Sequence, residues 1–284
     1  MISIDKPEPM ANNTSWAVSL VRGDLLFRLQ RKVGLIPEQG LGIVRRALFW
    51  SLLAWLPTAV WAWMKGGFLP VEGSEPLLAH FGINARLLLG VPLFIIAEGM
   101  MHGTLTALLP RLVSSGVVPP SQLDHLRSVL TGVARLRDSA LPWIAIAAVL
   151  SSFFLLAAPN ELPHELSWAG NQSDGAGLGF GAWWYLYVGR TIFLVLLLAW
   201  LWRLALLFVL FKRIAGLELS LVPKLGPIAD TAAPYELITK IRPVPLNMGS
   251  LAPLVGAAVL PMIVLMALDL PLKTVLKTVL KILV

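Results

Sequence analysis

Residues 87–109 read LLLGVPLFIIAEGMMHGTLTALL. This apolar run is long enough to cross the hydrocarbon of a bilayer, which takes about 20 helical residues. It nevertheless carries two ionisable side chains, Glu98 and His102, four residues apart. The stretch therefore predicts a membrane-spanning helix, and it raises the question of what these two side chains do inside it.

The composition extends this prediction to the whole chain. Hydrophobic residues make up 57% of the 284 residues and charged residues only 14%, whereas a soluble domain usually carries about a quarter charged residues. The apolar runs do not alternate with polar residues, which argues against the strands of a membrane barrel. We therefore predict an all-α fold, a multi-pass transmembrane helical bundle of about five spans. The expected spans are residues 47–64, 87–109, 141–158, 183–211 and 251–270.

Amphipathic helices are expected at both ends of the chain. In the N-terminal segment, residues 1–46, the stretch 14–33 mixes apolar and basic residues at helical spacing, and Gly34 can end that helix. A helix of this kind lies in the membrane interface or, alternatively, packs on a cytoplasmic loop. The C-terminal segment 271–284 is also predicted to be an interfacial helix. The lysines that it would present to lipid headgroups are Lys273, Lys277 and Lys281.

The basic residues predict how the chain is oriented. With the N-terminus in the cytoplasm, the inner segments hold 16 Lys and Arg residues and the outer segments between spans hold two, as the positive-inside rule requires. Five spans place the C-terminus outside. A hairpin folded back at Pro261 would bring it inside, but a proline within a spanning helix costs less, so we favour five spans. The N-terminus has no cleavable signal pattern, so the first span is expected to direct insertion.

The net charge of +7 indicates a class of partner. Because the basic residues flank apolar runs, they favour anionic lipid headgroups over nucleic acid. The chain has no cysteine, which excludes disulfides, thiolate metal sites and cysteine nucleophiles.

Four stretches resemble an uncharacterised family of bacterial multi-pass inner-membrane proteins. The resemblance implies a bacterial inner (plasma) membrane and no assigned activity, and it covers roughly a third of the chain. The stretches are RGDLLFRLQRKVGLIP at 22–37, HFGINARLLLGVPLFIIAE at 80–98, GAWWYLYVGRTIFLVLLLAWLWRLALLFVLFKRI at 181–214 and RPVPLN at 242–247.

Glu98 and His102 project from the same face of their predicted helix, because positions four apart stack. A charge at the centre of a bilayer costs about 2.5–3.5 kcal/mol on insertion scales, so such residues turn inward and find partners. A carboxylate and an imidazole could relay protons or bind a cation. Alternatively they join helices by hydrogen bonds, and Gly99 and Gly103 would let those helices approach closely. The spacing matches neither a zincin nor a di-iron pattern, so we predict no metal or cofactor.

Arg190 and Arg203 complete the predicted intramembrane polar site of Glu98, His102, Arg190 and Arg203. Counting the helical rise from the expected outer boundary, Arg190 lies deep enough to pair with Glu98. Arg203 lies near the expected inner end of its span, where its side chain could extend to the headgroups. The sequence thus predicts a Glu98–Arg190 pair, with His102 beside a polar cavity.

Two functional hypotheses follow from these observations. In the first, an oligomeric bundle transports or conducts an ion or small solute along Glu98, His102 and Arg190, and intramembrane ionisable residues favour this reading. In the second, the chain is a non-catalytic membrane scaffold or regulatory partner that binds lipids or other membrane proteins. A homo-oligomer is expected in the first case, because five short spans make a thin bundle. An intramembrane enzyme is the least favoured class, since no catalytic constellation is present.

Overall fold

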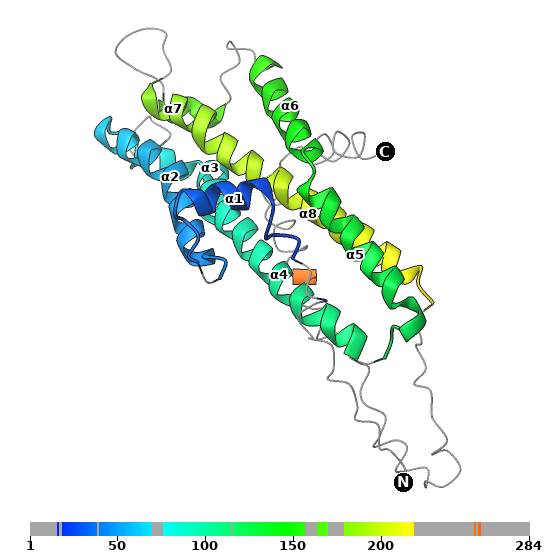
Figure 1. The fold of residues 1–284 in the computed structure, drawn as a ribbon. Coiled ribbons are helices and arrows are strands. Elements are labelled where there is room, and N and C mark those ends of the chain that lie inside the picture. The colour runs from blue at the N-terminus through cyan, green and yellow to red at the C-terminus, as the bar shows by residue number, and fades with distance from the viewer. Residues whose placement is uncertain are drawn as a thin grey trace, which may run out of the picture.

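The structure, a computed structural model, describes residues 16, 19–38, 40–69, 76–114, 116–156, 164–169 and 179–218, together with 253, 255 and 256. Every regular element in these residues is a helix, so the predicted all-α class of a membrane helical bundle is confirmed. Figure 1 shows the helices as an elongated bundle, with the two longest side by side. The predicted C-terminal helix 271–284, with its three lysines, lies outside the described residues.

Among the described residues, three helices are long and apolar enough to cross a membrane, and they suit an integral membrane protein. The first is α2 (Ile43–Met64). The second runs from Phe81 to Ser114 and consists of α3 (Phe81–Asn84), the π-helical η3 (Ala85–Gly90) and α4 (Val91–Ser114). The third runs from Phe180 to Ala215 and consists of α7 (Phe180–Trp184), the π-helical η6 (Tyr185–Gly189) and α8 (Arg190–Ala215).

The predicted count of about five spans is not confirmed. The expected span 141–158 corresponds to α6 (Leu141–Leu156), and the residues that follow Leu156 lie outside the described part of the chain. The expected span 251–270 lies almost wholly outside the described residues. The second and third candidate spans are also longer than predicted. The second continues beyond the expected residues 87–109 through Arg86 and Arg111, and the third continues beyond residue 211 through Lys212 and Arg213. Arg86 stays within the bundle by donating a hydrogen bond to the Tyr185 hydroxyl at 3.0 Å.

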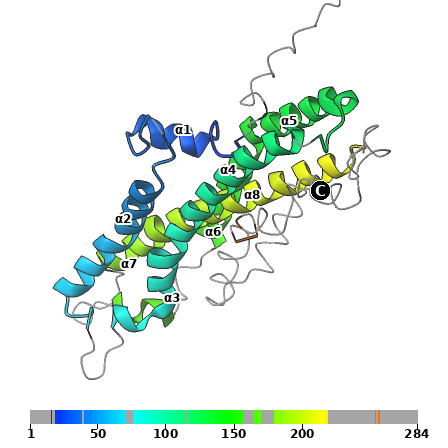
Figure 2. The ribbon, with the colours of Figure 1, turned by 90° about the horizontal axis from the view of Figure 1, so that it is seen from below.

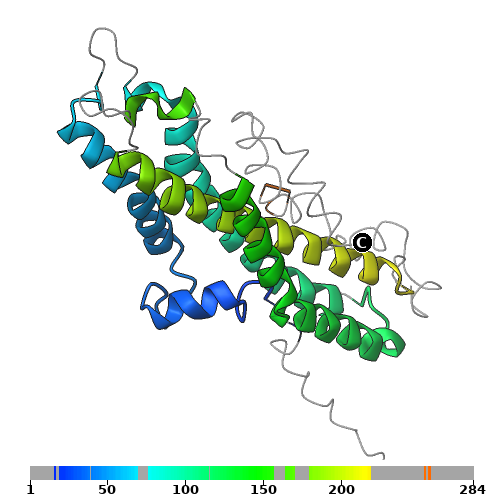
Figure 3. The ribbon, with the colours of Figure 1, turned by 90° about the horizontal axis from the view of Figure 1, so that it is seen from above.

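Shorter helices pack against the candidate spans. α5 (Leu123–Asp138) packs along α8, and α6 contacts α8 as well. α1 (Leu25–Lys32) lies crosswise to the long helices α4 and α8, as Figures 2 and 3 show from opposite sides. The remaining short helices are η2 (Leu77–Ala79), η4 (Pro120–Gln122) and η5 (His164–Ala169).

The predicted N-terminal helix 14–33 is shorter in the structure, where the helix α1 begins only at Leu25. Gly23 has a φ of 105°, a left-handed conformation that glycine adopts without strain and that interrupts a right-handed helix. The other end is as expected: α1 ends at Lys32, and Gly34 has a φ of 76°. Asp24 takes the N-cap position but forms no capping hydrogen bond, so its carboxylate is available for another contact.

Close packing at one end of the bundle aligns the first and third candidate spans. The Trp61 ring of α2 lies against Gly179 and Gly181, where an added Cβ atom would come within 2.1 and 2.5 Å of it. Pro57 lacks an N–H, so it leaves the carbonyl of Leu53 without its helical donor. The indole N–H of Trp184 donates to that carbonyl at 3.1 Å. We refer to this end as the Trp61 end.

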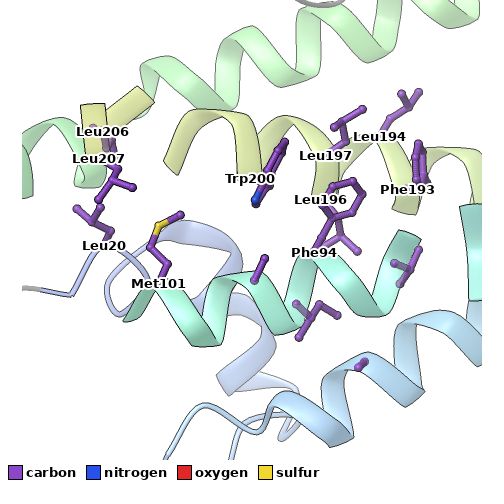
Figure 4. Close-up of a cluster of buried hydrophobic side chains, with 14 of the residues drawn as sticks. Leu20, Phe94, Met101, Phe193, Leu194, Leu196, Leu197, Trp200, Leu206 and Leu207 are labelled. Atoms are coloured by element: carbon purple, nitrogen blue, oxygen red, sulfur yellow. The ribbon is translucent and has the colours of Figure 1, made fainter. Parts of the chain in front are cut away.

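Aromatic residues set how α4 and α8 align with each other. The Phe94 ring lies 5.6 Å from the Phe193 ring and 5.6 Å from the Trp200 ring, measured between centroids. Figure 4 shows Phe94 and Trp200 meeting between the two helices within the hydrophobic core. An added Cβ at Gly90 would lie 2.8 Å from the Phe193 ring, so glycine allows this approach. Phe94 of α4 is therefore level with residues 193–200 of α8.

Candidate functional site: a buried ion-pair cluster

Glu98 is the centre of a buried group of charged side chains. Arg46 of α2 donates to it with both terminal nitrogens, Nη1 to Oε1 at 2.9 Å and Nη2 to Oε2 at 3.0 Å. Arg203 of α8 also donates from Nη1 to Oε2 at 3.2 Å. The two-pronged contact from Arg46 is the strong, planar form of a charge-assisted hydrogen bond. The three residues are only 0–2% exposed, so this carboxylate is removed from solvent.

Asp24 brings the N-terminal segment into the same group. Its Oδ2 accepts a hydrogen bond from Arg203 Nη2 at 2.7 Å, and its Oδ1 accepts one from the indole N–H of Trp143 in α6 at 3.1 Å. The Asp24 side chain is buried. Arg203 thus bridges two carboxylates, one from the N-terminal segment and one from α4.

Gln30 of α1 provides a second contact to the spans. Its Oε1 accepts a hydrogen bond from Arg46 Nε. One turn earlier in α1, the Phe27 ring lies 5.9 Å from the guanidinium carbon of Arg46, within the range of a cation–π contact. We refer to Asp24, Gln30, Arg46, Glu98 and Arg203 as the ion-pair cluster.

The charges of the ion-pair cluster cancel formally, because two guanidinium groups face two carboxylates. All four carboxylate oxygens accept a hydrogen bond. Two buried nitrogens of the cluster, Gln30 Nε2 and Arg203 Nε, have no acceptor among the described residues. Paired charges of this kind add less to stability than well-packed apolar groups, but removing one partner is expensive. The arrangement therefore favours one way of joining the segments over others.

The cluster lies far from the Trp61 end. At 1.5 Å per residue, Arg46 is about 27 Å from Met64, Glu98 about 26 Å from Phe81 and Arg203 about 35 Å from Phe180. A hydrocarbon core is about 30 Å thick. If the Trp61 end marks one boundary of the hydrocarbon, the cluster lies near the opposite boundary. The sequence had instead suggested that Glu98 lies near the middle of the bilayer.

The predicted Glu98–Arg190 pair is wrong, because Arg46 and Arg203 donate to both Glu98 oxygens. The aromatic contacts explain the error. Phe94 is level with residues 193–200, so one turn further along α4 brings Glu98 beside Arg203. Arg190 lies before Phe193, toward the Trp61 end. Arg203 is accordingly buried and paired, and the prediction that it extends to the headgroups is wrong as well.

His102 lies one turn from Glu98, as the spacing predicted, and interacts electrostatically with it and with Arg22. Its Nδ1 is buried and has no hydrogen-bond partner in the part of the chain that the structure describes. Of the two nearby glycines, Gly99 allows the close approach that was predicted, since an added Cβ would lie 2.2 Å from Ile43 Cδ1 of α2. No atom of the described residues lies close to the position of an added Cβ at Gly103.

Sequence reasoning missed Asp24, Gln30 and Arg46. Each lies outside the expected spans, where we treated charge as a signal of topology. A usable signal was present: Asp24 is the only acidic residue in the stretch 14–33, whose other charged residues are all basic. A lone carboxylate there is a candidate partner for a buried arginine.

In the part of the chain that the structure describes, no group of three or more His, Cys, Asp or Glu residues could hold a metal ion. Comparisons of the chain with protein-family models, with curated proteins and with solved structures find no match. The function is therefore argued from the geometry of the site alone.

Proposed function

We propose that the chain is a non-catalytic scaffold of a bacterial inner membrane, whose cytoplasmic N-terminal segment is docked onto the spanning helices through the ion-pair cluster. The observation that carries this proposal is the sharing of the Glu98 carboxylate by arginines of two different spans. One of these arginines also binds Asp24 of the N-terminal segment. A buried ionic contact with several partners is suited to specifying a single arrangement of segments.

The same geometry gives less support to transport. A path for ions or protons requires polar groups that meet water and exchange partners, whereas the cluster carboxylates are buried and each oxygen has a donor. Arg190, proposed from the sequence as a lining residue of the path, does not bind Glu98. Catalysis has no support either, because both cluster carboxylates are held by arginines and no nucleophile of the described residues forms a hydrogen bond with them.

Purified protein in liposomes tests this proposal. We expect H⁺, Na⁺ and K⁺ fluxes equal to those of protein-free liposomes, both for the natural chain and for Glu98→Gln. Glu98→Gln is the informative variant, because it keeps the shape of the side chain and removes its charge. A flux above the protein-free level that is lost in Glu98→Gln would instead establish transport through the cluster.

A further inference from the structure

A basic pocket of about 220 Å³ lies between the N-terminal segment and the loop that follows α1. Its apolar floor includes Phe27 and Ile36, which are buried together with Val21. Three arginines line it, Arg22, Arg28 and Arg31, with Glu38 as the acidic residue in the same lining.

The positive charge of the three arginines is the feature of the pocket that points to a ligand. Among the described residues, none of them forms an ion pair with an acidic side chain. Arg28 is near enough to Asp138 to act on it electrostatically, but Arg137 already holds that carboxylate with hydrogen bonds of 2.8 and 2.9 Å. These bonds hold the pKa of Asp138 below its usual range. An anion bound in the pocket would relieve the repulsion among the arginines.

The pocket is held in shape by contacts to the spans. Phe27 of its floor lies under Arg46, and Asp24 beside it is paired with Arg203. The loop is folded back by a hydrogen bond from the Leu35 N–H to the Gln30 carbonyl at 3.0 Å. The ion-pair cluster thus fixes the backbone that carries the three pocket arginines. Because this backbone is already ordered, binding a ligand costs less conformational entropy.

The surroundings of the pocket indicate where its ligand comes from. α1 and its C-cap residue Val33 expose an apolar ridge at helical spacing, with Leu25 42%, Leu29 50% and Val33 73% exposed. The helix joins α2 near Arg46, at the level where the hydrocarbon boundary is expected. An exposed apolar ridge beside arginines is the pattern of a helix that lies in a membrane interface. Phosphate groups of lipids are found at that depth, and arginine matches phosphate with paired hydrogen bonds.

We propose that Arg22, Arg28 and Arg31 form a binding site for the phosphate group of an anionic lipid headgroup. The proposal depends on the membrane setting of the chain and not on its role as a scaffold. A free phosphate ion has the same chemistry at the arginines, but it cannot use the apolar ridge. The lipid is therefore expected to bind far more tightly than the ion.

Native mass spectrometry of the full chain in detergent tests the site. The probes are phosphatidylglycerol, phosphatidylcholine and inorganic phosphate. We expect phosphatidylglycerol to be retained in preference to phosphatidylcholine, and Arg28→Gln/Arg31→Gln to raise its half-saturating concentration roughly tenfold or more. The matched control is Arg45→Gln, which removes an exposed arginine beside Arg46 but outside the pocket. It should change binding by less than about twofold.

Three outcomes would overturn this assignment. The first is equal retention of the two lipids, which would show that the pocket does not select anionic headgroups. The second is that Arg45→Gln raises the half-saturating concentration of phosphatidylglycerol as much as Arg28→Gln/Arg31→Gln does, which would mean that binding follows the general surface charge. The third is displacement of phosphatidylglycerol by inorganic phosphate at equal concentration, which would identify a site for a soluble anion. A melting curve of each variant confirms that it is folded before binding is compared.

Discussion

Replacing Glu98 by Gln should lower the free energy of unfolding by about 3–5 kcal/mol, because Arg46 and Arg203 would stay buried without the carboxylate that they share. A denaturant titration in detergent micelles measures this loss. We also expect Glu98→Gln and Arg46→Met to be coupled. The loss in the double variant should be about 0.5–3 kcal/mol smaller than the sum of the two single losses. The double variant leaves the Arg203–Asp24 pair intact and electrically balanced.

The control for this cycle is the pair that the sequence had suggested. Glu98→Gln and Arg190→Gln should lower the free energy of unfolding independently. The loss in the double variant should therefore equal the sum of the two single losses to within about 0.5 kcal/mol. Coupling between Glu98 and Arg190, together with additivity between Glu98 and Arg46, would contradict the observed pairing.

The second large effect is expected at Asp24. Asp24→Asn removes the charge that Arg203 meets in the N-terminal segment, so the segment should detach while the spans stay folded. Trypsin cleavage after Arg28 or Arg31 requires this local opening and should be about 100-fold faster, as expected for a loss of roughly 3 kcal/mol. Gel analysis of timed digests in micelles measures the rate.

Asp124→Asn is the matched control for the digestion. Asp124 forms an ion pair with Arg127 at 3.3 Å on the surface of α5, with the two side chains 93% and 62% exposed. Exposed pairs of this kind contribute little, so cleavage in α1 should stay at the natural rate. Equal rates for Asp24→Asn and the natural chain would mean that the Asp24–Arg203 pair does not hold the segment.

The class of the fold was predictable because it depends on local properties of the chain. The run around Glu98 is apolar over a length that spans a bilayer. It can be recognised as a spanning helix without knowing which other elements pack against it. The ends of the spans were less predictable. Arg86 resembled a boundary residue, and only the Tyr185 hydroxyl, which lies far away in the sequence, shows why the helix can begin before it.

The site was predictable in part. A carboxylate within an apolar helix requires a partner, and Glu98 has two. The identity of these partners depended on how α4 and α8 align, which the contacts of Phe94 with Phe193 and Trp200 determine. Helical rise counted from assumed boundaries could not supply that alignment. Asp24 was missed for a related reason: its role arises only once Gly23 turns the chain and places it beside Arg203.

The central claim is that the ion-pair cluster holds the N-terminal segment against the bundle. Spin labels on cysteines introduced at Lys32 of α1 and Ser128 of α5 test it directly, since the chain has no cysteine of its own and both sites are exposed. Double electron–electron resonance in lipid nanodiscs should give one narrow distance distribution for the otherwise natural chain. Adding Asp24→Asn or Glu98→Gln should broaden that distribution. A broad distribution before either substitution, or an unchanged narrow one after both, would contradict the account.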